Sequence, residues 1–250
     1  MKVHLPKKTR NLVKRYIHLR IGPHIIACPY YQNIIGKKRK TVYAGKGLPE
    51  KIEKETLRLF RKNNKNLNKY SPESLRLYMT MADLGIDCSG FVMRIIESLL
   101  RERGLGELSK NIKPKNYNPL NVARHFLRTE TNLSADTLTN SKNCNTISNL
   151  NEILPGDLIR VGKSHLAIIT EVEKSKNKVK KIIYHHSTSD YLDQHGVRKG
   201  VITINKPNMP LEKQKWEEYY QGKNWMLEDY SEAKKKDRGI RRMKMLSKTA

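Results

Sequence analysis

Hydrophobic residues in the first hundred positions recur every three to four residues, the spacing of amphipathic helices. A short, strongly basic helix is predicted within residues 1–20. Pro49 suits the first turn of a second helix. A third helix begins with Ser71 as its N-cap and Pro72 in its first turn, and it stops at Gly85.

The most apolar of these patterns begins at about Cys88 and runs to Gly104. It predicts a helix buried along one broad stripe, formed by Phe91, Val92, Ile95, Ile96, Leu99 and Leu100. Two prolines favour an extended chain over residues 21–32. A shorter helix is expected from Asn118 in NPLNVARHFL, and residues 130–150 are expected to form a polar loop.

Beyond residue 150 the pattern changes to short strands. LPGDLIRVG predicts a turn and a strand, SHLAIITEVE a second strand, and KVKKIIYHHST a third strand joined to the second by a KSKN hairpin. GVITINK predicts a fourth strand, whereas MPLEKQKWEEYY and the basic segment from Ser231 look helical. Helices followed by an antiparallel meander indicate an α+β fold.

Positive charge is concentrated at the two ends of the chain. The formal net charge is +26, and residues 1–65 hold 18 Lys and Arg against 3 Glu, while residues 231–250 hold 8 against 2 acidic residues. We therefore divide the chain into a basic N-terminal extension (1–84) packed on the core, a core (85–209) and a basic helical tail (210–250). Basic ends favour a polyanionic partner, either nucleic acid or an anionic surface, or else form a merely solvated surface.

Cysteine usage and hydropathy limit the compartment and the cofactors. The three cysteines are neither closely paired nor in a CxxC motif, so neither a disulfide framework nor a zinc site is expected. The sequence contains neither an apolar signal-peptide region nor a transmembrane stretch. These features predict a cytoplasmic protein without cofactors, unless another route exports it.

Cys88 occupies a position suited to nucleophilic chemistry. A helix N-terminus presents unpaired N–H groups and partial positive charge, which lower the pKa of a thiol. Asp87 can cap the helix, and Ser89 leaves space for a substrate. The backbone N–H groups after the cysteine can donate to a developing oxyanion. Cys88 is therefore the candidate nucleophile, with a lowered pKa.

A general base is expected from the strands. His165 opens the second strand, and His185 and His186 lie on its hairpin partner, where one of them can orient the His165 imidazole. Adjacent residues of a strand point to opposite faces, so only one of the two can do so, and both cannot bind one metal ion. Strand alternation does not decide between them, and no metal site is predicted.

Taken together and in order, GIDCSGFV, LPGDLI, SHLAIITEV and YHHSTS resemble the NlpC family of papain-like cysteine peptidases, over roughly residues 85–205. The resemblance implies a papain-like fold, with the nucleophile helix packed on an antiparallel sheet, and a Cys-His-polar triad. In that family a small residue typically follows the third member. Ser187 follows His186, so the resemblance assigns Cys88, His165 and His186, with His185 as the alternative third residue.

The chain also departs from this family pattern. The family usually carries a PY-x-(W/Y)-GG segment just before the nucleophile, where this chain has the helical TMADLGI. The nearest look-alike is Pro29-Tyr30-Tyr31, so a helical insertion is expected to separate the two parts and Tyr30 to return to the site. Arg198 is either a surface residue or a ligand for a substrate carboxylate.

The predicted function is cleavage of amide or peptide bonds, in the stem peptides of peptidoglycan as the resemblance implies. The alternative is a papain-like scaffold that is non-catalytic or transfers acyl groups, and whose basic ends bind nucleic acid or an anionic surface. The hydrolase and the non-catalytic scaffold differ in whether a thiol-reactive probe labels Cys88 faster than the other cysteines.

Overall fold

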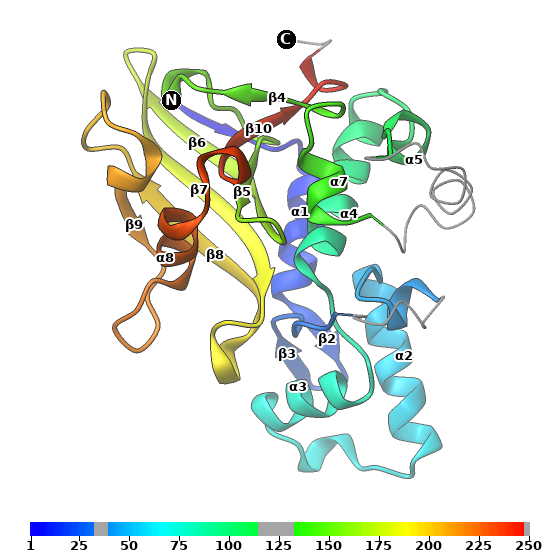
Figure 1. Cartoon of the computed structure of the whole chain (residues 1–250). Helices are drawn as coiled ribbons and strands as arrows, with labels where there is room; N and C mark the ends of the chain where they lie inside the picture. The colour runs from blue at the N-terminus through cyan, green and yellow to red at the C-terminus, as the bar shows by residue number, and fades with distance from the viewer. Residues whose placement is uncertain (33–39, 115–132, 248–250) are drawn as a thin grey trace.

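A computed structural model describes residues 1–32, 40–114 and 133–247 of the chain. Within these residues, a helical N-terminal half lies beside one antiparallel sheet of eight strands, and a two-stranded hairpin stands apart from the sheet (Figure 1). The α+β class predicted from the sequence is confirmed.

The helices are α1 (Lys7–Ile17), α2 (Pro49–Lys62), α3 (Pro72–Met81), α4 (Cys88–Glu102), α5 (Leu108–Asn111), α7 (Ala135–Thr139) and α8 (Trp225–Glu232). Short 3-10 turns are η1 (Thr41–Tyr43), η2 (Leu67–Lys69), η3 (Leu150–Glu152), η4 (Leu192–Gln194), η5 (Leu211–Lys213) and η6 (Lys235–Asp237). The strands are β1 (Lys2–His4), β2 (Leu19–Ile21), β3 (His24–Ile26), β4 (Cys144–Ile147), β5 (Leu158–Val161), β6 (His165–Ser175), β7 (Lys178–Thr188), β8 (Gly196–Thr203), β9 (Lys215–Glu217) and β10 (Gly239–Met243).

Local signals account for the first helices. Pro49 and Pro72 occupy the first turns of α2 and α3, and Ser71 forms a capping box with Ser74. Helix α4 begins at Cys88 and buries the predicted stripe, while α3 ends at Met81, earlier than expected. The helix expected from residue 118 lies outside the described residues.

The sheet has the order β4-β10-β5-β6-β7-β8-β9, and β1 pairs with β6 beyond the end of β5. Its central strands are buried on both faces. Leu166 and Ile168 of β6 belong to the core that includes α1 and α4, whereas Ala167 and Ile169 belong to a second core beside α8 (Figure 1). Burial on both faces explains why β6 begins as a continuous apolar run rather than an alternating one.

Residues 130–150 were expected to form a polar loop, but their described part, residues 133–150, contains a helix and a strand. Ser134 caps α7 by accepting a hydrogen bond from the Thr137 N–H at 3.1 Å, and Leu138 of this helix is fully buried. Strand β4 then pairs with β10, from Cys144 opposite Met243 onward. This pairing joins segments far apart in sequence, so local composition could not reveal it.

The prediction that residues 210–250 form a helical tail is wrong in part. Residues 215–217 form β9, because the chain alternates there and buries Gln214, Trp216 and Glu218. Helix α8 ends at Glu232, and the basic segment after it becomes β10, which is inserted between β4 and β5. Arginines of this segment bond to acidic residues within the fold, for example Arg242 to Asp157. Their positive charge is therefore not a sign of a solvated helical tail.

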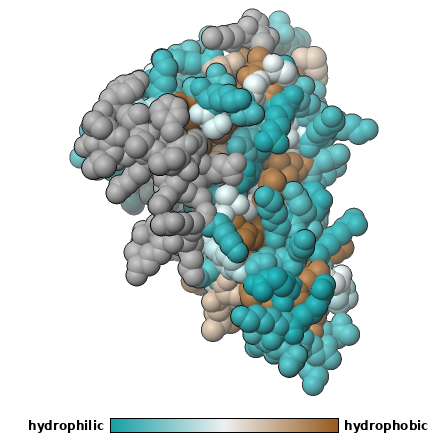
Figure 2. Space-filling model, turned by 90° about the vertical axis from the view of Figure 1, so that its right-hand side faces the viewer, coloured by the Kyte–Doolittle hydropathy of each residue, from teal (hydrophilic) through white to brown (hydrophobic). Residues whose placement is uncertain are grey.

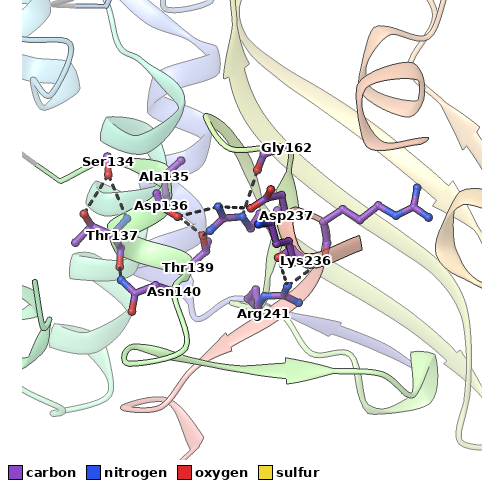
Figure 3. A network of polar contacts seen from close by, with 12 residues as sticks. Ser134, Ala135, Asp136, Thr137, Thr139, Asn140, Gly162, Lys236, Asp237 and Arg241 are labelled. Atoms are coloured by element: carbon purple, nitrogen blue, oxygen red, sulfur yellow. Dashed lines mark hydrogen bonds and ion pairs between the residues drawn. The ribbon is translucent and has the colours of Figure 1, made fainter. Parts of the chain in front are cut away.

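A polar network around the buried Arg160 of β5 joins three segments that are distant in sequence. The partners of Arg160, namely Asp136, Gly162 and Asp237, are labelled in Figure 3. Its guanidinium lies 2.8 Å from Asp136 of α7 and 3.3 Å from Asp237, just before β10. It also donates to the Gly162 carbonyl at 3.2 Å. The network thus anchors the turn between β5 and β6, which carries the residues before His165.

The surface agrees with the charged composition. On the side displayed in Figure 2 most described residues are hydrophilic, with smaller hydrophobic areas between them. None of the described helices combines the length and the apolarity needed to span a bilayer.

Candidate active site

The first turn of α4 holds Cys88 in a tightly packed position. Asp87 caps the helix as expected, accepting a hydrogen bond from the Gly90 N–H at 2.6 Å. A Cβ atom on Gly90 would lie 2.1 Å from the Gly45 carbonyl oxygen, so glycine is required for this approach. The segment at Gly45 is therefore pressed against the helix start.

A buried ion pair that sequence reasoning missed lies beside the cysteine. Lys46 is only 2% exposed, and its Nζ lies 2.6 and 2.8 Å from the two carboxylate oxygens of Asp87. It also contacts the Ser89 hydroxyl, which donates to Asp87 at 2.9 Å. Ser89 was expected to leave space for a substrate, but its hydroxyl bonds to Asp87 and Lys46. The sequence signal was weak, a single lysine between two glycines.

The Cys88 thiol does not have the lowered pKa expected at a helix N-terminus. Burial, together with the negative charge of Asp87, raises the pKa of Cys88 to about 12. The positive charge of Lys46 and the backbone N–H groups of Leu166 and Ser89 act in the opposite direction without overcoming this. The resting thiol is therefore neutral at pH 7.

The thiol lies against the start of β6. Its sulfur is 3.3 Å from the Ser164 carbonyl oxygen, to which it donates, and the N–H of Leu166 also interacts with it. These two backbone groups flank His165 on either side. The structure thus brings Cys88, the candidate nucleophile of α4, to the part of β6 that carries the predicted base.

His165 forms its hydrogen bond with His186. The distance from His165 Nε2 to His186 Nδ1 is 2.8 Å, and the two rings meet edge to face. Burial, with the adjacent His186, lowers the pKa of His165 to about 3, so this imidazole is neutral at pH 7. His185 instead bonds to the Thr170 hydroxyl at 3.0 Å. Of the two adjacent histidines, only His186 bonds to His165.

Behind His186 lies a buried carboxylate, Glu218. It was not identified from the sequence, because residues 209–220 were predicted to be helical. Its Oε1 is 2.8 Å from His186 Nε2, and its Oε2 accepts a hydrogen bond from the Tyr184 hydroxyl at 2.7 Å. Burial alone would raise its pKa, but His186, Tyr184 and Arg198 outweigh this and lower the pKa of Glu218 to about 2. Glu218 is therefore ionised.

Arg198 is occupied by this carboxylate rather than presented as a substrate ligand or a surface residue. Its Nε donates to Glu218 Oε1 at 3.1 Å, and its guanidinium lies 3.6 Å from the centre of the Tyr191 ring. With its side chain 14% exposed, Arg198 acts inside the fold.

Tyr30 lies near Cys88 despite the long separation in sequence. The Ile86 N–H donates to the Pro29 carbonyl at 3.0 Å, so residues 29–31 run beside the segment before Cys88. A Cβ atom on Gly85 would lie 2.5 Å from the same carbonyl oxygen. Burial and then the nearby Cys88 raise the pKa of Tyr30, so its hydroxyl remains a donor. This is the placement expected from the PY look-alike.

Because the Cys88 thiol is neutral at pH 7, we expect its rate of alkylation to depend steeply on pH. Below a pKa of about 12, the thiolate fraction grows about tenfold per pH unit. The rate at which iodoacetamide alkylates Cys88 should therefore rise about tenfold for each pH unit between about pH 7 and 10. Peptide mass spectrometry can follow Cys88 alone, with free cysteine levelling off near its own pKa of about 8.5 as the control. A plateau already reached by pH 6 would indicate a preformed thiolate–imidazolium pair.

Within the described residues, no cluster of histidine, cysteine and acidic side chains could hold a metal ion. Comparisons of the chain with protein-family models, with characterised proteins and with solved structures give no match. The site consists of the Cys88 thiol at a helix start, bonded to backbone groups on either side of His165, and of the His165 imidazole, which bonds to His186 and through it to Glu218.

Proposed function

We propose that this chain is a papain-like cysteine hydrolase that cleaves amide or peptide bonds. The observation that carries the proposal is the 2.8 Å hydrogen bond between His165 and His186 at the strand start against which the Cys88 sulfur rests. A nucleophile, a base and a group that orients the base are the parts that such catalysis requires. The contacts of α4 with β6 and β7 support the papain-like arrangement.

In the proposed reaction the proton moves during the attack. His165 Nδ1 accepts the thiol proton while the Cys88 sulfur bonds to the substrate carbonyl carbon, whose π electrons move to the oxygen. Collapse of this intermediate expels the amine, which takes the proton from His165 and leaves a thioester. Water then attacks the thioester carbonyl and gives a proton to His165. The C–S bond breaks, the carboxylic acid leaves, and His165 returns the proton to the Cys88 sulfur. A neutral thiol and a neutral base suit this sequence, because no ion pair has to persist in a buried site.

Two kinds of hydrogen-bond donor near Cys88 could stabilise the negative charge that develops on the substrate carbonyl oxygen. The first turn of α4 offers backbone N–H groups, among them that of Ser89, which already interacts with the sulfur. The Tyr30 hydroxyl, beside Cys88, is the second donor; it donates to Gln32 at 3.0 Å in this structure and would have to turn toward the substrate.

For the substrate, we propose the stem peptides of peptidoglycan. The support is the resemblance of GIDCSGFV, LPGDLI and YHHSTS to the NlpC family, together with a net charge of +26 that suits an anionic cell-wall polymer. The rival proposal, a papain-like scaffold whose basic surface binds nucleic acid, finds some support in the buried, high-pKa thiol.

Loss of the nucleophile separates these proposals. Cys88→Ala should lower the hydrolysis of purified peptidoglycan fragments about a thousandfold or more, measured by mass spectrometry of the products. Cys144→Ala is the matched control, since this cysteine is buried against Leu138 rather than at the site and its loss should spare turnover. Substantial hydrolysis by folded Cys88→Ala protein would refute the mechanism, and inactive wild-type protein would favour the scaffold.

The two adjacent histidines should respond differently to substitution. His186→Ala removes the partner of His165 and should lower turnover about a hundredfold to ten-thousandfold. His185→Ala removes only the bond to Thr170 and should leave turnover within a few fold. Thermal unfolding of both variants checks that each is folded at the assay temperature. The greater loss in His185→Ala would reverse the assignment.

A further inference from the structure

The His165–His186 pair has two possible proton arrangements that its geometry alone does not distinguish. If His165 Nε2 carries the proton and donates to His186 Nδ1, then Nδ1 of neutral His165 is free to accept a proton from the thiol. If the bond runs the other way, Nδ1 of neutral His165 is itself protonated and cannot act as a base. A hydrogen bond of 2.8 Å between two imidazoles allows both arrangements, so a further group has to choose between them.

We propose that Glu218 is the positioning residue that makes this choice. An ionised carboxylate can only accept hydrogen bonds, so His186 Nε2, 2.8 Å from Glu218 Oε1, has to donate. When His186 carries one proton, that proton is therefore on Nε2, and its Nδ1 accepts a hydrogen bond from His165 Nε2–H. His165 is left with an unprotonated Nδ1, the form that a base requires. The tautomers follow from these hydrogen bonds and a single proton on His186, whereas their catalytic consequence rests on the proposed function.

Glu218 can act in this way because its surroundings keep it ionised. The side chain is 1% exposed, and its two oxygens receive three donors, one each from Tyr184, His186 and Arg198. Arg198 is in turn held in place by the Tyr191 ring and by the Gln194 carbonyl. The other titratable groups around the site are Cys88, Asp87, Lys46, Tyr30, Asp190, Asp229, His185 and Lys199.

The same carboxylate would assist the transfer itself. When the Sγ–H bond breaks and the Nδ1–H bond forms, His165 gains a positive charge in a buried site. Glu218, one imidazole away, offsets this charge until Nδ1 passes the proton to the leaving amine. Glu218 lies beyond residues 85–205, the part of the chain that resembles the NlpC family, so this position was not suggested by the resemblance.

Nitrogen NMR of the histidine side chains in the full chain tests the proposal without any substrate. In 15N-labelled wild-type protein at pH 7, both His165 and His186 should be in the Nε2–H form, with both Nδ1 atoms unprotonated. A protonated Nδ1 on neutral His165, or a mixture of the two tautomers, would overturn the proposal.

Glu218→Gln supplies the second test. The amide presents both a donor and an acceptor to His186, so the pair should become a mixture of tautomers and kcat should fall about a hundredfold, with KM within about twofold. Glu217→Gln is the matched control, because this neighbour faces away and pairs with Lys215 and Thr203. Its tautomers and kcat should match those of the wild type.

The outcomes separate the two proposals. A Glu218→Gln protein with wild-type tautomers, whatever its kcat, would refute the positioning role. If the variant fails to fold, the wild-type tautomers alone still decide. Predicted tautomers in a protein that cleaves no peptide would leave Glu218 as the residue that sets them and refute only the hydrolase.

Discussion

The pairing register between β6 and β7 is the constraint on which the candidate site depends. Ile168 pairs with His185, which puts His186 on the face that carries Tyr184 and leaves His185 on the other. A slip by one residue would exchange the two histidines and break the bonds to both His165 and Glu218. The register is held because alternate residues of these strands fill two separate cores, one under α4 and one beside α8.

Burial gives the site its electrostatic character. It raises the pKa of Cys88 and lowers that of His165, so both side chains are uncharged at pH 7. Charges nearby are paired: Lys46 with Asp87 at the helix start, and Glu218 with Arg198 behind the histidines. The candidate site therefore combines an uncharged thiol and an uncharged imidazole with paired charges around them.

Local patterns in the sequence were enough to predict the elements that carry Cys88, His165 and His186, because apolar spacing and turn residues determine them. The PY look-alike also predicted the return of Tyr30. Strand β10 and Glu218 could not be found in this way. Strand β10 forms only by pairing with strands that are distant in sequence. Glu218 lies in an alternating strand pattern in which two of the buried residues, Gln214 and Glu218, are polar, so the pattern is not recognised from hydrophobicity. Lys46 was missed because a buried lysine is recognised only once its partner is known.

If Cys88 is the nucleophile, it forms a covalent intermediate with a peptide carbonyl. Rapid acid quenching of the wild-type protein with peptidoglycan stem peptides, followed by intact-mass measurement and peptide mapping, detects this intermediate. We expect a thioester on Cys88, with the mass of the acyl half of the substrate, that forms before the second product is released. Products that accumulate while Cys88 stays unmodified at every quench time, or an acyl group found on another residue, would contradict it.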